Sequence, residues 1–246
     1  MPALWLSKSS KMKVSLGNSK AGSFLSLEYP GIGNETLKAL HATGAHVFST
    51  VRDVEKGQAA VDSILAEKIK TGGKITLIKM ELDSLASVRA GAQDFLQQSK
   101  ILNVLINNAG VMATPEGRTK DSFETQFGTN HLSHFLLFEL LKPTLLASAT
   151  PEFPSRVVSV SSIGHRSGSV QLHDYNFDEP GSYSPGLPTA KPRPQTSSSQ
   201  TRSSAVMVRV SFMQHPYALG EPSPACRNVS ILRRQSHGTR LPRGRT

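Results

Sequence analysis

Residues 101–112, Ile-Leu-Asn-Val-Leu-Ile-Asn-Asn-Ala-Gly-Val-Met, decide the fold class of this chain. The first half is an apolar run of the length of one strand, and the second half changes to the small and polar residues 107–110. This pattern predicts a strand buried in a parallel sheet and ending in a loop. Because ligands of open α/β sheets bind beyond the carboxyl ends of the strands, the loop is a candidate binding site. The alternative is a simple turn.

Strands and helices alternate on both sides of this stretch. Strands are predicted at residues 45–51, 75–82, 102–106 and 157–160, and helices at residues 34–40, 54–70 and 121–141. A weaker strand pattern covers residues 24–27. The alternation predicts an α/β fold, a three-layer sandwich with a Rossmann-like, doubly wound parallel sheet. We expect a poorly patterned segment over residues 1–30, this domain over residues 31–185, and a mostly irregular tail over residues 186–246 that leaves the sheet incomplete at its C-terminal end.

Length and composition indicate one domain without a disulfide or metal framework. At 246 residues the chain has the size of a single α/β domain. Its one cysteine, Cys226, excludes an internal disulfide and a multi-cysteine metal site, and His131 and His134 lack the carboxylates of a metal motif. No apolar run is long enough to span a membrane and the first residues lack a signal-peptide core, so we expect a soluble cytoplasmic protein.

The basic charge is concentrated in the tail. The formal net charge is +10, but ten of the 28 Lys and Arg residues, against one of the 18 acidic residues, lie within residues 188–246. The rest of the chain is therefore nearly neutral. Because the tail has few aromatic residues for base stacking and shows no recognisable binding fold, we expect no nucleic-acid partner.

A dinucleotide site is predicted in the first part of the domain. Gly31, Ile32 and Gly33 precede a helical pattern, where glycines allow a phosphate to approach the backbone N–H groups at the start of the helix. Arg52 follows the next strand, and Lys56 lies one turn later. A basic residue at this position can pair with the 2′-phosphate of NADP(H), whereas an acidic residue would bind the free ribose of NAD(H). The alternative is that Arg52 is a solvated surface charge.

Two blocks of sequence give the chain a family resemblance. Residues 107–110, Asn-Asn-Ala-Gly, and residues 127–135, Phe-Gly-Thr-Asn-His-Leu-Ser-His-Phe, resemble motifs of the short-chain dehydrogenase/reductase family. The second block is most similar to the retinol dehydrogenase and WW-domain oxidoreductase group, which has many members in filamentous fungi, some of them in secondary-metabolite gene clusters. The resemblance implies hydride transfer between a nicotinamide cofactor and a small lipophilic alcohol or ketone.

The resemblance also implies roles for individual residues. Asn130 matches the active-site asparagine that holds a water in the proton relay, and Ser162 matches the serine that hydrogen-bonds the substrate carbonyl. Glu81 and Leu82 match an Asp-Leu pair at the adenine; Asp83 is a competing candidate for that role or a helix cap. The loop residues that line the cofactor site are Asn108, Ala109 and Gly110. A purely structural role for a buried Asn130 is the alternative.

Two departures from the family pattern affect the expected activity. Ser26 and Leu27 stand where the family has Thr-Gly, so the first glycine of the phosphate loop is missing and cofactor binding should be weaker. The family also uses a Tyr as general acid/base, with a Lys four residues later that lowers the pKa of the Tyr. No tyrosine of this chain is followed by such a Lys, so the chain as written lacks the pair.

The genetic code offers an explanation for the missing pair. Residues 188–196, Pro-Thr-Ala-Lys-Pro-Arg-Pro-Gln-Thr, permit codons that read Ala-Tyr-Gly-Gln-Ala-Lys-Thr-Ala-Asn in a shifted frame, which is similar to the active-site helix of the family. One T added before the codon of Gly186 joins this frame and turns residues 183–186 into Tyr-Ser-Pro-Trp. We infer that the tail over residues 186–246 is out of frame. The alternative is a natural low-complexity tail rich in Ser, Pro and Arg.

The sequence therefore predicts an NADP(H)-dependent short-chain dehydrogenase/reductase by descent. Its expected partner is a small-molecule carbonyl or alcohol substrate, and its activity is expected to be impaired in the chain as written. The alternative is a catalytically inactive remnant or a non-catalytic binding protein.

Overall fold

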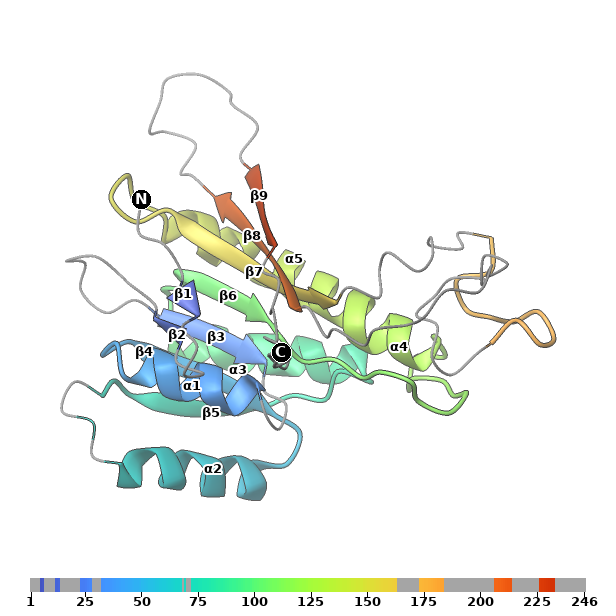
Figure 1. Cartoon of the computed structure of the whole chain (residues 1–246), viewed down its shortest axis with the longest axis horizontal. Helices are drawn as coiled ribbons and strands as arrows, with labels where there is room; N and C mark the ends of the chain where they lie inside the picture. The colour runs from blue at the N-terminus through green and yellow to red at the C-terminus, as the bar shows by residue number, and fades with distance from the viewer. Residues whose placement is uncertain are drawn as a thin grey trace, which may run out of the picture.

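The computed structural model describes residues 33–67, 69, 72–162 and 173–183 with their side chains, and only the backbone at residue 32 and in the strands outside these ranges. The large sheet consists of β3 (Ser23–Leu27), β4 (His46–Val51), β5 (Ile75–Lys79), β6 (Val104–Asn107), β7 (Ser155–Ser162), β8 (Val206–Met213) and β9 (Cys226–Leu232). The strands lie in the order β5-β4-β3-β6-β7-β8-β9 (Figure 1). A separate antiparallel pair joins β1 (Trp5–Leu6) to β2 (Met12–Lys13).

The first five strands of this order form the parallel sheet that the sequence predicts. β3, which the sequence indicates only weakly, lies at its centre: Leu25 is opposite Phe48 of β4 on one side and Leu105 of β6 on the other. Leu105 in turn is opposite Val157 of β7. The predicted α/β class and the doubly wound parallel sheet are therefore confirmed.

The segment after residue 186 contributes two strands that the sequence analysis did not predict. β8 lies antiparallel to β7 and β9 antiparallel to β8, so they extend the sheet beyond its parallel part (Figure 1). The sequence of β8, Val-Met-Val-Arg-Val-Ser-Phe-Met, has valine at alternate positions, which favours an extended strand beside an existing one. The sequence analysis expected a mostly irregular tail and did not anticipate these two strands. The remainder of residues 186–246 lies outside the described residues.

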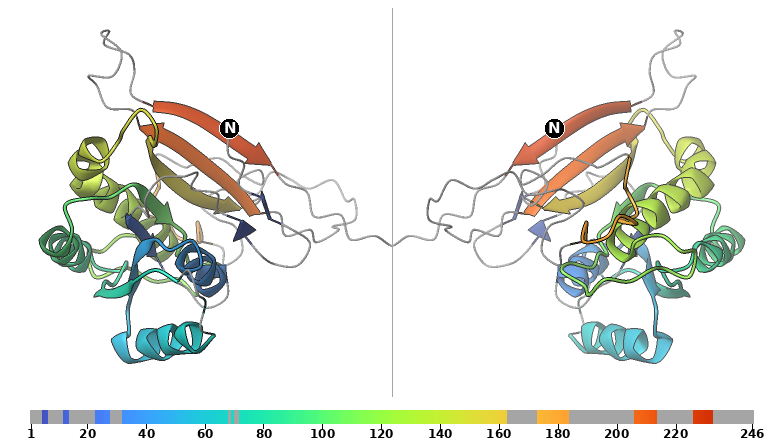
Figure 2. Two further views of the ribbon diagram at one scale, coloured as in Figure 1. Left: turned by 90° about the vertical axis from the view of Figure 1, so that its left-hand side faces the viewer. Right: turned by 90° about the vertical axis from the view of Figure 1, so that its right-hand side faces the viewer.

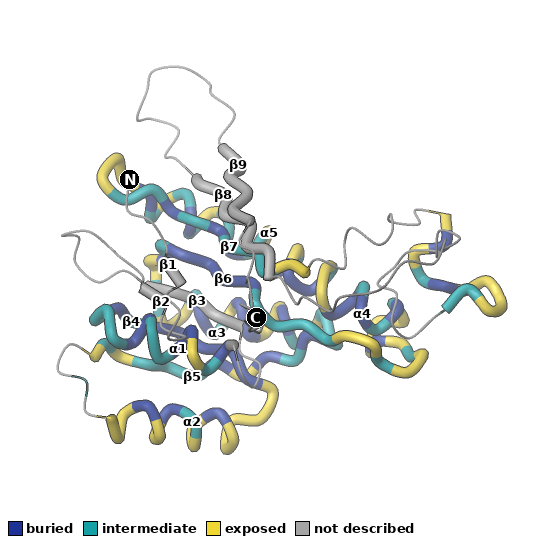
Figure 3. Tube along the Cα trace, viewed as in Figure 1, coloured by how far each residue is buried: buried dark blue, intermediate teal, exposed yellow. Residues whose placement is uncertain are grey.

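Helices cover both faces of the sheet and complete the three layers. They are α1 (Ile32–His41), α2 (Val54–Ala66), α3 (Leu85–Gln98), α4 (Thr125–Phe127), the π-helix η1 (Gly128–Leu132) and α5 (Ser133–Ala147). α3 and α5 pack side by side against one face, and α1 and α2 lie on the other (Figure 2). The burial pattern follows the layers, because α2 buries its inward side and exposes the opposite side (Figure 3).

Two hydrophobic cores, one on each face of the sheet, explain why the first three residues of β6 are all apolar. Leu105 of β6 belongs to the core under α3 and α5, whereas its neighbours Val104 and Ile106 belong to the core under α1 and α2. Successive side chains of a strand point to opposite faces, so a strand covered on both sides buries apolar side chains on both. In the first core the rings of Phe48 and Phe95 meet edge to face, with centroids 4.9 Å apart.

The starts of two helices differ from the sequence prediction. The helix predicted from residue 121 begins at Thr125, because Ser122 adopts a left-handed φ of 66° and the carboxylate of Glu124 accepts hydrogen bonds from two N–H groups of the first turn. Ser84, and not Asp83, caps α3: the Ser84 hydroxyl accepts from the backbone N–H of Ser87 at 3.2 Å. Among the described helices, none is long and apolar enough to cross a bilayer.

Candidate active site

The carboxyl ends of the parallel strands lie along one edge of the sheet, where most of the predicted site residues follow them. Arg52 follows β4, Glu81 and Leu82 follow β5, Asn108 to Gly110 follow β6, and Ser162 ends β7. The sheet order therefore places Arg52 and Glu81 toward one end of this edge and Ser162 toward the other, with the loop after β6 between them.

Asn130 is bonded to the loop after β6 at both ends of its side-chain amide. Its Nδ2 donates to the Val111 carbonyl at 2.8 Å, and its Oδ1 accepts from the Val111 N–H at 2.8 Å. A Cβ on Gly110 would lie 3.1 Å from Asn130 Oδ1, so this approach favours glycine. The structure thus brings Asn130 together with the loop that was predicted to line the cofactor. The side chain is exposed, which does not fit the buried position assumed from the sequence.

The turn that carries Asn130 is a π-helix, which the sequence analysis did not predict. Residues 128–132 widen the helix for one turn before α5 continues it. Such single π turns inside helices are frequent at functional sites, because the widened turn redirects the side chains that it carries. Periodicity averages over several turns and gives no signal for one irregular turn.

His134 holds the same loop from the first turn of α5. Its Nε2 lies 2.7 Å from the Ala109 carbonyl oxygen, and its ring is 8% exposed. Burial lowers the pKa of His134 from 6.5 to about 4. Its partner in the sequence pattern, His131, is exposed and stacks on Phe127 with a centroid distance of 5.5 Å. No cluster of three or more metal-ligating side chains occurs among the residues that the structure describes.

Ser162 is the last residue of β7 and its side chain is exposed. The register pairs Ser159 of β7 with Asn107 of β6, so Ser162 extends past the end of β6 toward the loop that follows it. Across the other side of β7, Ser162 is opposite Val206 of β8. A hydroxyl at this position is accessible to a ligand at the carboxyl edge of the sheet.

The predicted phosphate site is described only in part. Gly31 lies outside the described residues, and at Ile32 only the backbone is described, as the first residue of α1. Gly33 is buried in the first turn of this helix, which follows the central strand β3. The N-terminal end of a helix therefore meets the carboxyl edge of the sheet where the sequence predicted a pyrophosphate.

At the other end of the edge, Arg52 is exposed and Asp53 uses its carboxylate to cap α2. Asp53 Oδ1 accepts from the Lys56 N–H at 3.1 Å, and its Oδ2 lies 3.5 Å from Lys56 Nζ. The Lys56 side chain is 87% exposed. Arg52 and Lys56 are thus both in solvent, while the acidic residue between them is already bonded.

Glu81 forms an ion pair that the sequence analysis missed. Lys120, from the connection between β6 and α4, donates to the Glu81 carboxylate, and its Nζ lies 3.7 Å from Asp83 Oδ1. The hydrogen bond from Lys120 is the main cause of the lowered pKa of Glu81, and the charges of Lys79 and Arg52 contribute. Arg52 therefore lies within electrostatic reach of Glu81. Leu82 instead points into the core, and its carbonyl accepts from the Ser133 hydroxyl.

Tyr183 is tied to the connection after β6 and is not a free acid. The Tyr183 hydroxyl donates to the Thr114 carbonyl at 2.6 Å and accepts from Gln126 Nε2 at 3.5 Å. Arg118 of this connection bonds Asp178 at 2.8 Å, so the segment 173–183 is held against it at a second place. The phenolic hydrogen of Tyr183 is thus already donated in a hydrogen bond to the backbone.

We expect Tyr183→Phe to lower the free energy of unfolding by about 1 kcal/mol, because it leaves the Thr114 carbonyl without this donor. Urea denaturation measures the change. Tyr175→Phe is the matched control, since the Tyr175 side chain is 43% exposed. Equal stability of Tyr183→Phe and the control would contradict the assigned hydrogen bond.

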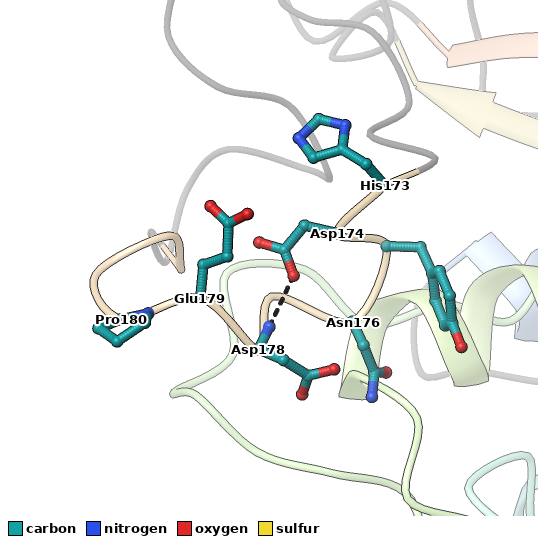
Figure 4. Close-up of a pocket in the computed structure, with 7 residues that line it drawn as sticks. His173, Asp174, Asn176, Asp178, Glu179 and Pro180 are labelled. Carbon is teal, nitrogen blue, oxygen red and sulfur yellow. Dashed lines mark hydrogen bonds between the residues drawn. The ribbon is translucent and has the colours of Figure 1, made fainter.

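A hollow of about 400 Å³ lies beside the segment 173–180 (Figure 4). Residues of this one segment line it, including Asp174, whose Oδ1 accepts from the Asp178 N–H at 2.7 Å. None of the predicted site residues borders it. We therefore place the candidate site at the carboxyl edge of the sheet and not in this hollow.

A protein-family comparison agrees with this arrangement. The model of the family described as short chain dehydrogenase matches residues 29–176. The chain belongs to this family. It is 51% identical over 155 residues to short-chain dehydrogenase/reductase prx1 of Penicillium roqueforti, which covers 63% of this chain and 44% of that protein. Mouse retinol dehydrogenase 12 is 46% identical over 144 residues, covering 58% and 44% of the two chains.

A solved structure also shares the fold of this chain. A crystal structure of an uncharacterized protein from Mycobacterium paratuberculosis shares 37% identity and a TM-score of 0.57, covering 69% of this chain and 56% of that chain. The chain spans about half the length of the curated relatives that it matches. Short-chain dehydrogenases are oxidoreductases that use nicotinamide cofactors and act on small molecules.

Proposed function

We propose that this chain derives from an NADP(H)-dependent reductase or dehydrogenase of small lipophilic ketones or alcohols, and that the catalytic activity of the chain with its present sequence is impaired. The observation that carries the proposal is the common edge of the sheet, where Arg52 lies at the end of β4, the loop over residues 108–110 at the end of β6 and Ser162 at the end of β7. A dinucleotide lying along this edge would place its adenosine end near Arg52 and its nicotinamide near Ser162.

The residues at the edge fit such a cofactor. Gly110 allows the close approach of the Asn130 side chain that holds the loop, and Gly33 lies in the first turn of the helix that would meet the phosphates. The side-chain oxygen Oδ1 of Asn107 is buried without a hydrogen-bond partner among the described residues, as expected of a group that awaits a ligand or water. Leu27 in place of the first loop glycine opposes tight binding.

We propose that the phosphorylated cofactor is preferred because of Arg52. Its guanidinium is exposed at the end of β4 and can form two parallel hydrogen bonds with a 2′-phosphate. The neighbouring carboxylate that would select a free ribose, Asp53, is engaged in capping α2. Lys56, one turn into this helix, adds a second positive charge.

Arg52→Ala should remove most of the preference for NADPH over NADH. Loss of a charged hydrogen bond predicts an NADPH dissociation constant about 10-fold to 100-fold higher, with NADH binding nearly unchanged. Isothermal titration calorimetry with both cofactors measures this difference. Arg89→Ala, which removes an exposed arginine of α3, is the matched control. Equal affinity of the unmodified chain for NADPH and NADH would contradict the proposal that Arg52 binds the 2′-phosphate.

Catalysis is proposed to be impaired because the chain has no tyrosine followed four residues later by a lysine to act as the general acid. Ser162 can orient a substrate carbonyl by a hydrogen bond, and Asn130 can fix the loop or a water. Neither a serine hydroxyl nor an amide readily gives up a proton, and Tyr183 donates to Thr114. The family match ends at residue 176, ahead of the segment in which we infer a change of frame.

A non-catalytic binding protein is the second candidate, and the geometry of Asn130 favours it. Both polar groups of this amide are bonded to Val111, which is the contact expected of a structural residue. In this reading the edge still binds a dinucleotide but transfers no hydride. Cofactor binding without turnover of any carbonyl compound by the frame-restored protein would support this candidate.

A further inference from the structure

We propose that His134 is a positioning residue for the nicotinamide end of the site, acting through the carbonyl of Ala109. The proposal rests on the proposed function in one respect, the direction in which the cofactor lies along the sheet edge. With Arg52 after β4 and Ser162 at the end of β7, the loop after β6 is the one next to the nicotinamide. His134 fixes the position of this loop through its hydrogen bond to the Ala109 carbonyl.

The hydrogen bond fixes the state of the ring. A carbonyl oxygen can only accept, so His134 Nε2 must carry a hydrogen and donate it to Ala109 at 2.7 Å. The other nitrogen, Nδ1, is buried without a hydrogen-bond partner among the described residues. His134 therefore has one hydrogen bond, donated by Nε2, and one buried ring nitrogen without a partner among the described residues.

This combination indicates a role beyond filling space. Burying an unpaired ring nitrogen is unfavourable, and a phenylalanine or leucine would fill the same volume without that cost. The only polar interaction that offsets the cost within the described residues is the bond to Ala109. We therefore assign to His134 the function of holding the loop after β6 through the Ala109 carbonyl.

The neighbouring residue shows that the start of α5 positions two loops separately. Ser133 is 1% exposed and its hydroxyl donates to the carbonyl of Leu82, in the loop after β5. His134 donates to the loop after β6. Ser133 thus belongs to the adenosine side of the edge and His134 to the nicotinamide side, so the two residues provide a matched comparison.

The first test uses the full chain without cofactor and measures hydrogen exchange by mass spectrometry. His134→Phe removes the donor, His134→Gln places an amide donor near the position of Nε2, and Ser133→Ala removes only the neighbouring bond. We expect amides of residues 109–112 to exchange about tenfold faster in His134→Phe, and at nearly the original rate in His134→Gln and Ser133→Ala. Exchange in β4 and α2 should remain unchanged.

The second test separates the two halves of the cofactor. Reduced nicotinamide mononucleotide should bind about tenfold more weakly to His134→Phe, whereas 2′,5′-ADP should bind as before. His134→Gln should recover the binding of the nicotinamide half. Ser133→Ala should leave that half unaffected, because its contact lies at the loop after β5.

The outcomes distinguish the two proposals. Unchanged exchange over residues 109–112 in His134→Phe, or a uniform increase through the whole domain, would overturn the positioning role. If His134→Phe does not fold, His134→Gln is compared with His134→Asn, whose shorter side chain should not reach the Ala109 carbonyl. Equal hydrogen exchange over residues 109–112 in these two variants would overturn the positioning role. Failure of the unmodified chain to bind either half would refute the proposed cofactor function, while faster loop exchange in His134→Phe alone would still support the positioning of the loop.

Discussion

Inserting one base before the codon of Gly186 should give a protein that reduces carbonyl compounds with NADPH about 10² to 10⁴ times faster than the chain as written, the usual contribution of a general acid/base. The restored frame supplies a tyrosine followed four residues later by a lysine. The lysine stabilises the phenolate, so the tyrosine can give its proton to the carbonyl as hydride arrives. The disappearance of NADPH absorbance with ketone substrates measures the gain.

The insertion has two controls. Adding three bases at the same place lengthens the chain by one residue but keeps the present frame, and should leave turnover as low as before. Replacing the restored tyrosine by phenylalanine should abolish the gain while the protein stays folded. Substantial ketone reduction by the original chain would contradict the proposal, and Tyr183→Phe would then show whether Tyr183 has become the acid despite its bond to Thr114.

Acidification should destabilise the chain through His134 in the range between pH 6.5 and about pH 4. Burial lowers the pKa of His134 in the folded protein from 6.5 to about 4, with a smaller effect of the His131 charge. The unfolded chain therefore binds a proton in this range before the folded one does. The folded state therefore has its full free energy of unfolding above pH 6.5. As the pH falls toward 4, protonation of His134 in the unfolded chain lowers this free energy by up to about 3 kcal/mol.

Urea denaturation at pH 7 and near pH 4.5 tests this expectation. Carboxylates with lowered pKa values, such as Asp53 and Glu81, also lose stabilising interactions in acid, so the informative quantity is the difference between the original chain and a variant. His134→Phe should lose clearly less stability between these two pH values. An identical loss in both proteins would show that His134 does not titrate in this way.

The sequence by itself determined the α/β class, the alternation of strands and helices along the chain, and the parallel direction of the predicted strands. Residues 104–106 are apolar on both faces of the strand, and that pattern is local, so it predicts a strand covered by two layers of helices. Arg52 at the end of one strand and Ser162 at the end of another were likewise found from their places in the chain.

The tertiary structure alone decided the contacts between segments far apart in sequence. The weak pattern over residues 24–27 became the central strand because β4 and β6 supply its hydrogen bonds, and β8 gains its ladder from β7 in the same way. Lys120 reached Glu81 and His134 reached Ala109 because the connections fold back over the sheet edge. Periodicity records which face a residue occupies within its own element, whereas these partners depend on how the elements pack.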